Sequence, residues 1–95
     1  MVEKYNKLKS KYKEYVVFIK RGCFYEVYDI DAIIIRNIFG YKVRVVDNSM
    51  CCGIYEKYIN RVLSKLTRFY INYIIYIDDV TDVSKFKKNC YSTYF

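Results

Sequence analysis

The sequence predicts one α/β domain over residues 1–95, in which a mixed β-sheet of about six strands is covered by three or more helices. Three observations support this fold class. Segments with apolar residues at every third or fourth position alternate with short β-branched and aromatic runs. The length fits a single domain. Hydrophobic residues make up 54% of the chain, which is enough for a buried core and too many for a disordered segment.

The first third of the chain predicts a helix followed by two strands. The helix is expected over residues 2–15, where lysines cover most of the surface around one apolar stripe. That stripe consists of Val2, Tyr5, Leu8, Tyr12 and Tyr15. Residues 16–20 and 23–28 are β-branched and aromatic, so both are predicted strands, and Gly22 marks a bend between them.

The middle of the chain predicts a second helix and two further strands. The helix is expected over residues 30–39, with Asp29 as its N-cap and Gly40 directly after its end. The same Ile-rich run also fits a strand, and the flanking Asp and Gly favour the helix. The alternating residues 41–46 and the short run 50–54 are predicted strands, separated by a polar Asp-Asn-Ser turn.

A third helix is predicted over residues 55–69. Its apolar stripe is Ile59, Val62, Leu63, Leu66 and Phe69, and its basic stripe is Lys57, Arg61, Lys65 and Arg68. Residues 71–77 form the next predicted strand. The Asp-rich segment 78–82 is expected to be a turn rather than a metal site. The best candidate for a last strand is NCYSTYF, at residues 89–95.

The composition points away from enzymes and toward a binding protein. Lys and Arg outnumber Asp and Glu by 17 to 10, and a net charge of +7 suits a polyanionic partner such as nucleic acid, although it also fits simple solubility. The chain has no His, which removes the usual general base and a common metal ligand. Its four Cys lack a CxxC spacing, so we expect reduced thiols, no metal and no cofactor.

The sequence also predicts an intracellular location. Its Lys-rich N-terminus does not resemble a secretory signal. Its longest uncharged run, residues 69–77, is about half of the ~20 residues that a membrane helix needs. We therefore expect no membrane partner, and a location in the cytoplasm or nucleoid, or in a virion if the source is a phage.

The stretch RGCFYEVYDIDA, residues 21–32, combines a glycine, aromatic residues and a glutamate. Residues two apart on a strand share a face, so Phe24 and Glu26 are expected to point the same way. An apolar ring beside a hydrogen-bond acceptor suits a surface that contacts a partner. The alternative is that Phe24 is an ordinary core residue, with Glu26 solvated or paired with Lys20 or Arg21.

This stretch resembles the N-terminal mismatch-recognition domain, domain I, of the MutS family of DNA mismatch repair proteins. In that family, an apolar strand leads through a Gly to Phe-Tyr-Glu and then to an acidic segment that opens a helix. Further segments follow in the family's order at similar spacing: MCCGIY at 50–55, VLSKL at 62–66 and YIIYI at 73–77. The resemblance covers roughly residues 3–78 and implies the MutS domain I fold in a stand-alone chain.

The resemblance further implies contact with double-stranded DNA that is mispaired or distorted. In the family, the Phe of Phe-x-Glu enters the minor groove and stacks on a mispaired or unpaired base, and the Glu hydrogen-bonds to that base. The cations that flank this motif and the basic stripe of the third helix would bind phosphates. Such a stripe is also typical of the solvent-exposed face of an amphipathic helix. The expected DNA-binding residues are Phe24, Glu26, Lys20, Arg21, Lys57, Arg61, Lys65 and Arg68.

Two other functions compete with DNA binding. The first is a small structural or protein-interaction protein, for example of a phage or virus, that uses the same fold and its many Tyr residues to join a larger assembly. The second is an enzyme such as a nuclease. We expect no enzymatic activity, because the chain lacks His and a convincing set of carboxylates.

Overall fold

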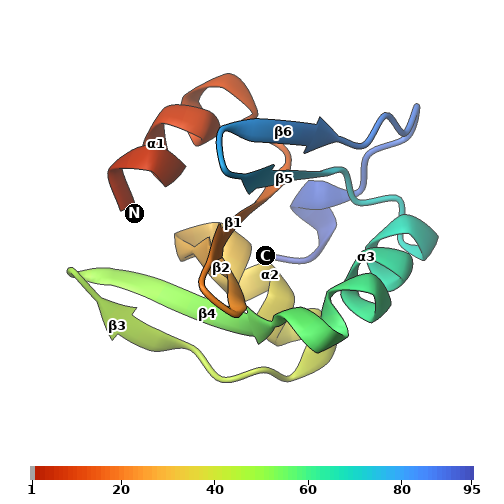
Figure 1. Cartoon of the computed structure of the whole chain (residues 1–95). Coiled ribbons are helices and arrows are strands. Elements are labelled where there is room, and N and C mark those ends of the chain that lie inside the picture. Colours follow the sequence, from red (N-terminus) through yellow and green to blue (C-terminus); the bar gives the residue numbers. More distant parts are fainter. Residues whose placement is uncertain (1) are drawn as a thin grey trace.

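The structure is a computed structural model and describes residues 2–95 (Figure 1). Helices and strands follow one another in the predicted order, with two short 3₁₀ helices, η1 and η2, added. The elements are α1 Val2–Lys11, β1 Val16–Arg21, β2 Phe24–Tyr28, α2 Asp29–Phe39, β3 Arg44–Val46, β4 Ser49–Tyr55, η1 Glu56–Tyr58, α3 Ile59–Arg68, β5 Tyr73–Ile77, β6 Val80–Val83 and η2 Tyr91–Thr93.

The strands form one six-stranded sheet in the order β3-β4-β2-β1-β5-β6. The central pair β1 and β5 is parallel, while the other neighbouring pairs are antiparallel. The predicted mixed α/β sheet is therefore confirmed. None of the helices within residues 2–95 combines the length and apolar character that crossing a membrane would take.

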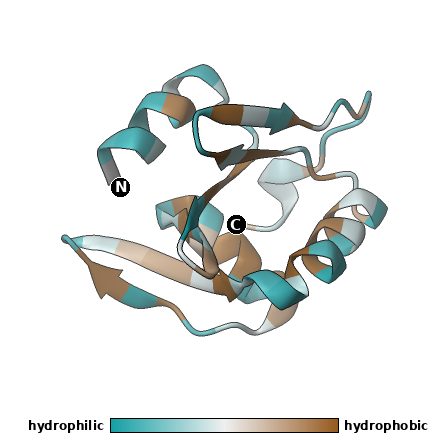
Figure 2. Ribbon diagram, viewed as in Figure 1, coloured by the Kyte–Doolittle hydropathy of each residue, from teal (hydrophilic) through white to brown (hydrophobic). Residues whose placement is uncertain are grey.

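Two apolar cores lie on opposite faces of the sheet, because successive strand residues point to opposite sides. One face packs against α2 and α3, and its fully buried residues include Phe18, Ile35 and Leu66. The other packs against α1 through Tyr5 and Tyr28. Figure 2 shows hydrophobic stretches of β1 and β5 in the middle of the fold.

A buried polar cluster joins α1 to α2 and to the C-terminal segment. Asp31 is fully buried, and its carboxylate accepts hydrogen bonds from the hydroxyls of Tyr5 (2.7 Å) and Tyr91 (2.6 Å), from the Lys9 ammonium (2.9 Å) and from the Val17 N–H (3.1 Å). Burial raises the pKa values of both tyrosines, and the Asp31 carboxylate adds to that shift. Lys9 belongs to the lysines that the helical pattern places on the surface of the first helix, and that prediction is wrong for it because its side chain is only 20% exposed.

The first helix is shorter than predicted and ends at Lys11 rather than at residue 15. The Lys9 ammonium binds the carbonyl of Tyr15, and the Val16 N–H donates to the carbonyl of Asn72. The chain must therefore leave the helix before residue 16 in order to pair with β5. The third helix, predicted over residues 55–69, is a 3₁₀ turn followed by α3.

Asp29 does not cap α2. Its φ is 51°, and its carboxylate accepts a hydrogen bond from the Met50 N–H of β4 (3.3 Å) instead of from the helix. At the other end, Gly40 follows the helix as predicted and has the left-handed conformation (φ 75°). Its N–H donates a hydrogen bond to the carbonyl of Arg36.

The last predicted strand is wrong, because residues 89–95 contain the short helix η2 and the sixth strand lies earlier. Asp78 and Asp79 have φ of 46° and 66°, and this left-handed pair turns the chain directly from β5 into β6. Thr81 and Asp82 therefore lie in a strand rather than in the predicted turn. The strand predicted at residues 41–46 is limited to β3.

Candidate functional site

Phe24 stands at the exposed end of the β1–β2 hairpin. Arg21 pairs with Phe24, so Gly22 and Cys23 form a two-residue turn, and Gly22 has the left-handed φ of 61° that glycine adopts without strain. The Phe24 side chain is 46% exposed. The alternative interpretation of Phe24 as a core residue is therefore wrong.

Three exposed aromatic residues, Phe24, Tyr55 and Tyr58, form an aromatic ridge that continues from β2 through the end of β4 to η1. The ring centroids of Phe24 and Tyr55 are 5.7 Å apart, and those of Tyr55 and Tyr58 are 6.3 Å apart. The guanidinium of Arg61 lies 5.2 Å from the centroid of the Tyr58 ring. The ridge thus connects the hairpin to the basic stripe of α3.

A cleft of about 280 Å³ lies beside the Phe24 ring and is lined by Phe24, Lys42, Arg44 and Gly53. We call it the Phe24 cleft. Gly53 contributes only backbone there, and a Cβ built on it would lie 3.6 Å from Phe24 Cδ1. Lys42 and Arg44 place two cations beside an exposed aromatic ring. Such a combination can bind an anionic ligand that also offers a flat apolar surface.

Glu26 lies on the same sheet face as Phe24 but is only 2% exposed. Its Oε1 accepts hydrogen bonds from the Tyr28 hydroxyl (2.9 Å) and lies 3.2 Å from Arg21 Nε, while its Oε2 lies 3.4 Å from Arg44 Nη2. The expected paired outward projection of Phe24 and Glu26 is therefore corrected: the ring is exposed and the carboxylate is covered. The side chains of Arg21 and Arg44 are 57% and 63% exposed, so solvent screens both ion pairs.

Lys20 is occupied by contacts within the protein. Its ammonium lies 3.1 Å from Glu56 Oε2 and donates to the carbonyl of Gly22 (2.6 Å). The hydrogen bond to Glu56 raises the pKa of Lys20. Lys20 therefore attaches the tip of the hairpin to η1, and its ammonium is already paired with a carboxylate.

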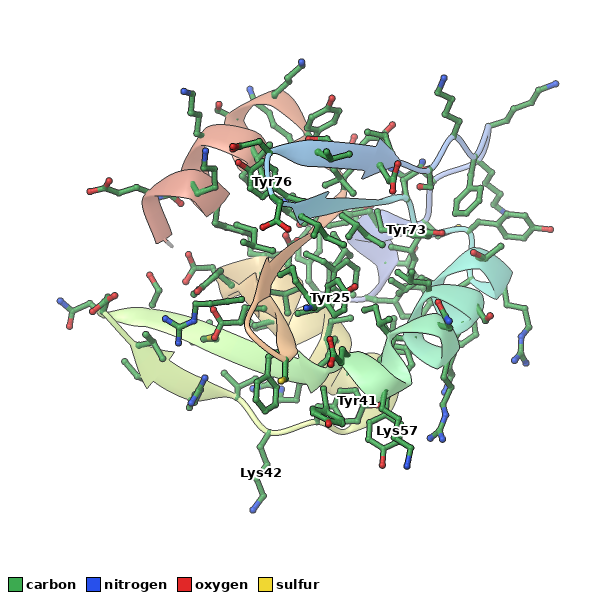
Figure 3. All side chains as sticks on the ribbon, viewed as in Figure 1. Tyr25, Tyr41, Lys42, Lys57, Tyr73 and Tyr76 are labelled. Atoms are coloured by element: carbon green, nitrogen blue, oxygen red, sulfur yellow. The ribbon has the colours of Figure 1, made fainter. Side chains whose placement is uncertain are left out.

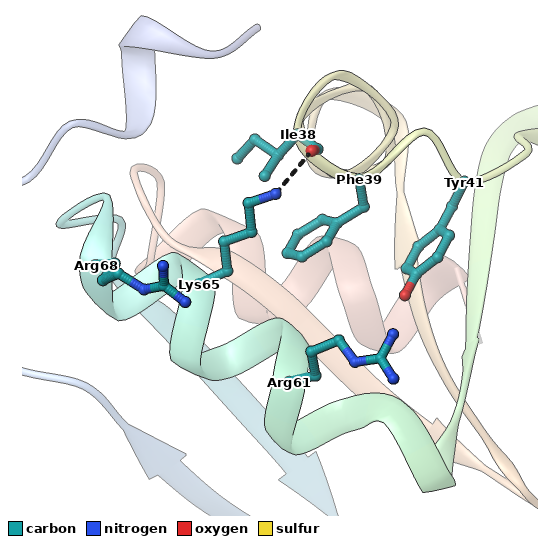
Figure 4. Close-up of a pocket in the computed structure, with 6 residues that line it drawn as sticks. All are labelled: Ile38, Phe39, Tyr41, Arg61, Lys65 and Arg68. Atoms are coloured by element: carbon teal, nitrogen blue, oxygen red, sulfur yellow. Dashed lines mark hydrogen bonds between the residues drawn. The ribbon is translucent and has the colours of Figure 1, made fainter.

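The predicted basic stripe of α3 separates into two parts. Arg61, Lys65 and Arg68 line a second cleft, of about 420 Å³, together with Ile38, Phe39 and Tyr41 (Figure 4). We call it the α3 cleft. Lys57 lies outside it, with its ammonium 5.9 Å from the centroid of the Tyr58 ring. Figure 3 shows Lys57, Tyr41 and Lys42 at the same end of the molecule.

The residues that complete the two clefts were not among the predicted site residues; they are Ile38, Phe39, Tyr41, Lys42, Arg44 and Gly53. Two signals pointed to some of them. Lys42 and Arg44 alternate with valines and so share one side of the chain, and a glycine within a predicted strand marks a close backbone approach. What the sequence does not reveal is which strand lies beside them.

The cysteines differ in burial. Cys51 and Cys52 are buried in the two opposite cores, and burial raises the pKa of Cys52 to about 11. Cys23 is exposed in the hairpin turn. In residues 2–95, no three His, Cys, Asp or Glu side chains gather in a way that would hold a metal ion.

Comparison with known proteins gives two matches. The family model described as MutS domain I matches residues 1–91. The DNA mismatch repair protein MutS of Ehrlichia chaffeensis (strain ATCC CRL-10679 / Arkansas) is 36% identical over 67 residues. This alignment covers 66% of the present chain and 8% of the relative, so the chain corresponds to a small part of that protein.

Proposed function

The chain belongs to the MutS domain I family, and we propose that it is a non-enzymatic DNA-binding module that prefers mispaired or distorted duplexes. The relative from Ehrlichia chaffeensis is named as a DNA mismatch repair protein. Because the chain matches only 8% of that relative, the proposal concerns recognition of DNA and not the other activities of a repair protein.

The observation that carries the proposal is the exposed ring of Phe24, which stands at a hairpin tip between two cations of the Phe24 cleft and the aromatic ridge. An apolar wedge that enters the minor groove must unstack a base step, at a cost of a few kcal/mol. That cost is lowest where a base is already mispaired or unpaired. A ring in this position therefore favours insertion at a mispaired or unpaired base over insertion between matched base pairs.

The charge distribution supports binding of a phosphate backbone at the same end of the molecule. Residues 32–46 and 57–77 contain no Asp or Glu, while they hold three and four cations respectively. The nearby acids Glu26 and Glu56 are both paired with cations. By contrast, Asp78, Asp79 and Asp82 belong to the β5–β6 hairpin, which lies at the opposite end of the fold in Figure 1.

In this proposal Glu26 becomes available only when DNA is bound. Phosphates would compete for the exposed guanidinium groups of Arg21 and Arg44, which lie 3.2 and 3.4 Å from its carboxylate oxygens. Release of the two arginines would leave the carboxylate with the Tyr28 hydroxyl and a base as partners. The arginines thus protect the carboxylate from phosphate repulsion until a base donor is in reach.

The test is a binding titration of the wild-type chain with fluorescein-labelled duplexes that differ only in one G·T mispair or one unpaired thymine. We expect tighter binding to the mispaired duplexes, and a steep fall in affinity for all duplexes as salt rises, because bound phosphates release counterions. Equal affinity for matched and mispaired duplexes would refute mismatch recognition. Affinity that does not change with salt would refute contact with the phosphate backbone.

A second candidate is a protein-interaction role, and the aromatic ridge favours it, since Tyr and Phe are enriched in protein interfaces. Three neighbouring aromatic residues that are 39–46% exposed could anchor a protein partner. Such binding would depend on Tyr55 and Tyr58 and would change little with salt. The salt titration above therefore separates the two functions.

A further inference from the structure

The α3 cleft has the dimensions and the lining of a ligand site. Its volume of about 420 Å³ falls within the range of roughly 300–1,000 Å³ that is usual for small-molecule sites. One wall is the exposed face of α3, where Arg61, Lys65 and Arg68 follow one another at helical spacing. The opposite wall is the end of α2 and the residues after it (Figure 4).

The wall opposite α3 presents aromatic rings. Phe39 and Tyr41 are stacked, with centroids 5.5 Å apart and an angle of 11° between the ring planes. The Lys65 ammonium lies 5.2 Å from the centroid of the Phe39 ring. Both aromatic side chains are only partly buried, and each ring has one face turned toward the other, so a planar ligand would stack on an outer face of this pair. Aromatic platforms of this kind stack on nucleic acid bases without selecting their sequence.

The cations of the α3 cleft are not neutralised by the protein. Within residues 2–95, Arg61, Lys65 and Arg68 take part in no ion pair, and neither α3 nor residues 32–46 contain an acidic residue. Lys65 donates one hydrogen bond, to the carbonyl of Ile38 (3.5 Å), which leaves two of its three ammonium hydrogens. An anion in the cleft would therefore find several unused donors.

We propose that the α3 cleft binds a nucleotide with an unpaired base, its phosphate between the cations of α3 and its base against Phe39 and Tyr41. The nucleotide is either free or part of a DNA strand that also passes the Phe24 cleft. One strand can reach both clefts, because Tyr41 lines the α3 cleft and the next residue, Lys42, lines the Phe24 cleft. The proposal goes beyond the mismatch function, since it requires neither a mispair nor Phe24.

The test uses the whole chain and a single-stranded thymidine tetranucleotide with a 5′-phosphate and a 3′-fluorophore. The double variant Arg61→Gln/Arg68→Gln should lower its affinity about tenfold or more, because two phosphate-binding groups are lost. The matched control is Lys85→Gln/Lys87→Gln, which removes the same charge from exposed side chains after β6. If both variants weaken binding equally, net charge alone explains it and the site is refuted.

The role of the aromatic wall has its own readout. Tyr41→Ala should weaken binding of the tetranucleotide about fivefold or more, since stacking on one ring has that effect or larger. The same variant should leave the binding of inorganic pyrophosphate unchanged, because pyrophosphate has no base. Unchanged binding of the tetranucleotide to Tyr41→Ala would overturn base recognition. Thermal unfolding of each variant checks that the fold is retained.

Two further experiments distinguish a free nucleotide from a DNA strand as the ligand, and the α3 cleft from the Phe24 cleft as the binding site. Displacement of the tetranucleotide by an equal concentration of thymidine 5′-monophosphate would support a free nucleotide as the ligand, and resistance to it would support a strand. Phe24→Ala should retain the tetranucleotide binding that Arg61→Gln/Arg68→Gln weakens. Loss of tetranucleotide binding in Phe24→Ala would overturn the separate site, whereas failure of mismatch preference alone would not affect it.

Discussion

The ring of Phe24 lies against Gly53 of the neighbouring strand, where a Cβ would be 3.6 Å from Phe24 Cδ1. The two residues belong to adjacent antiparallel strands, with Phe24 paired to Tyr55 and Glu26 paired to Gly53. The missing side chain at position 53 therefore leaves the Phe24 cleft open beside the ring. This relationship predicts how the size of residue 53 controls access to the ring.

Gly53→Ala should retain both fold and DNA binding, because a distance of 3.6 Å is an ordinary van der Waals contact. Gly53→Leu should fill the Phe24 cleft and displace the ring, which lowers the preference for mispaired over matched duplexes. Competition binding measures this preference, and urea unfolding verifies that each variant folds. An unchanged preference in Gly53→Leu would show that the cleft takes no part in recognition.

Glu26→Ala should change stability and binding in opposite ways. The variant leaves the buried hydroxyl of Tyr28 without its acceptor, which should lower the free energy of unfolding by about 1–3 kcal/mol. It also frees Arg21 and Arg44 for phosphates, so affinity for matched duplex should rise at low salt while the preference for mispaired duplex falls. Weaker binding to matched duplex would contradict the proposal that Glu26 competes with phosphates for Arg21 and Arg44.

Asp31→Ala should destabilise the protein by about 3–5 kcal/mol, because it leaves the partly buried ammonium of Lys9 and two tyrosine hydroxyls unpaired. Circular dichroism during urea unfolding measures the change. Asp82→Asn, at an exposed position on β6, is the matched control and should change stability by less than about 0.5 kcal/mol. A small effect of Asp31→Ala would mean that the cluster does not hold α1 in place.

Stability should fall as the pH rises from 9 to 11. Burial raises the pKa of Cys52 from its ordinary value of 9 to about 11, so over this range the unfolded state loses a proton that the folded state retains. The associated loss is about 2–3 kcal/mol and is complete above the folded pKa. Cys52→Val should reduce this pH dependence, while Cys23→Ser, in the exposed turn, should not. Equal pH dependence in both variants would refute the assignment to Cys52.

The order of elements and the identity of the core were predictable, because the residues that a helix or strand buries recur at that element's characteristic spacing. Ile59, Val62 and Leu66 recur at helical spacing and are buried as predicted. Element ends were less predictable, because tertiary contacts decide them. Lys9 contacts Asp31 and Tyr91, and Asp29 contacts Met50, all distant in sequence. These contacts replace the solvent-facing lysine and the helix cap that local patterns indicate.

The candidate site was predictable as a motif but not as a surface. The spacing of Phe24 and Glu26 places them on one face, as expected, yet Phe24 is exposed and Glu26 is buried, with Arg44 of β3 among the partners of its carboxylate. Strand order determines that contact, and no local pattern encodes it. The same limit applies to the α3 cleft, where residues near position 40 meet α3 only in the folded chain.

The most direct test of the central claim compares Phe24→Ala with Phe95→Ala, which truncates another exposed phenylalanine, at the C-terminus. The measured quantity is the ratio of the affinities for a duplex with one unpaired thymine and for the matched duplex. We predict that Phe24→Ala brings this ratio to one without changing the free energy of unfolding by more than about 1 kcal/mol, while Phe95→Ala keeps the wild-type ratio. A wild-type ratio that persists in Phe24→Ala would contradict the account.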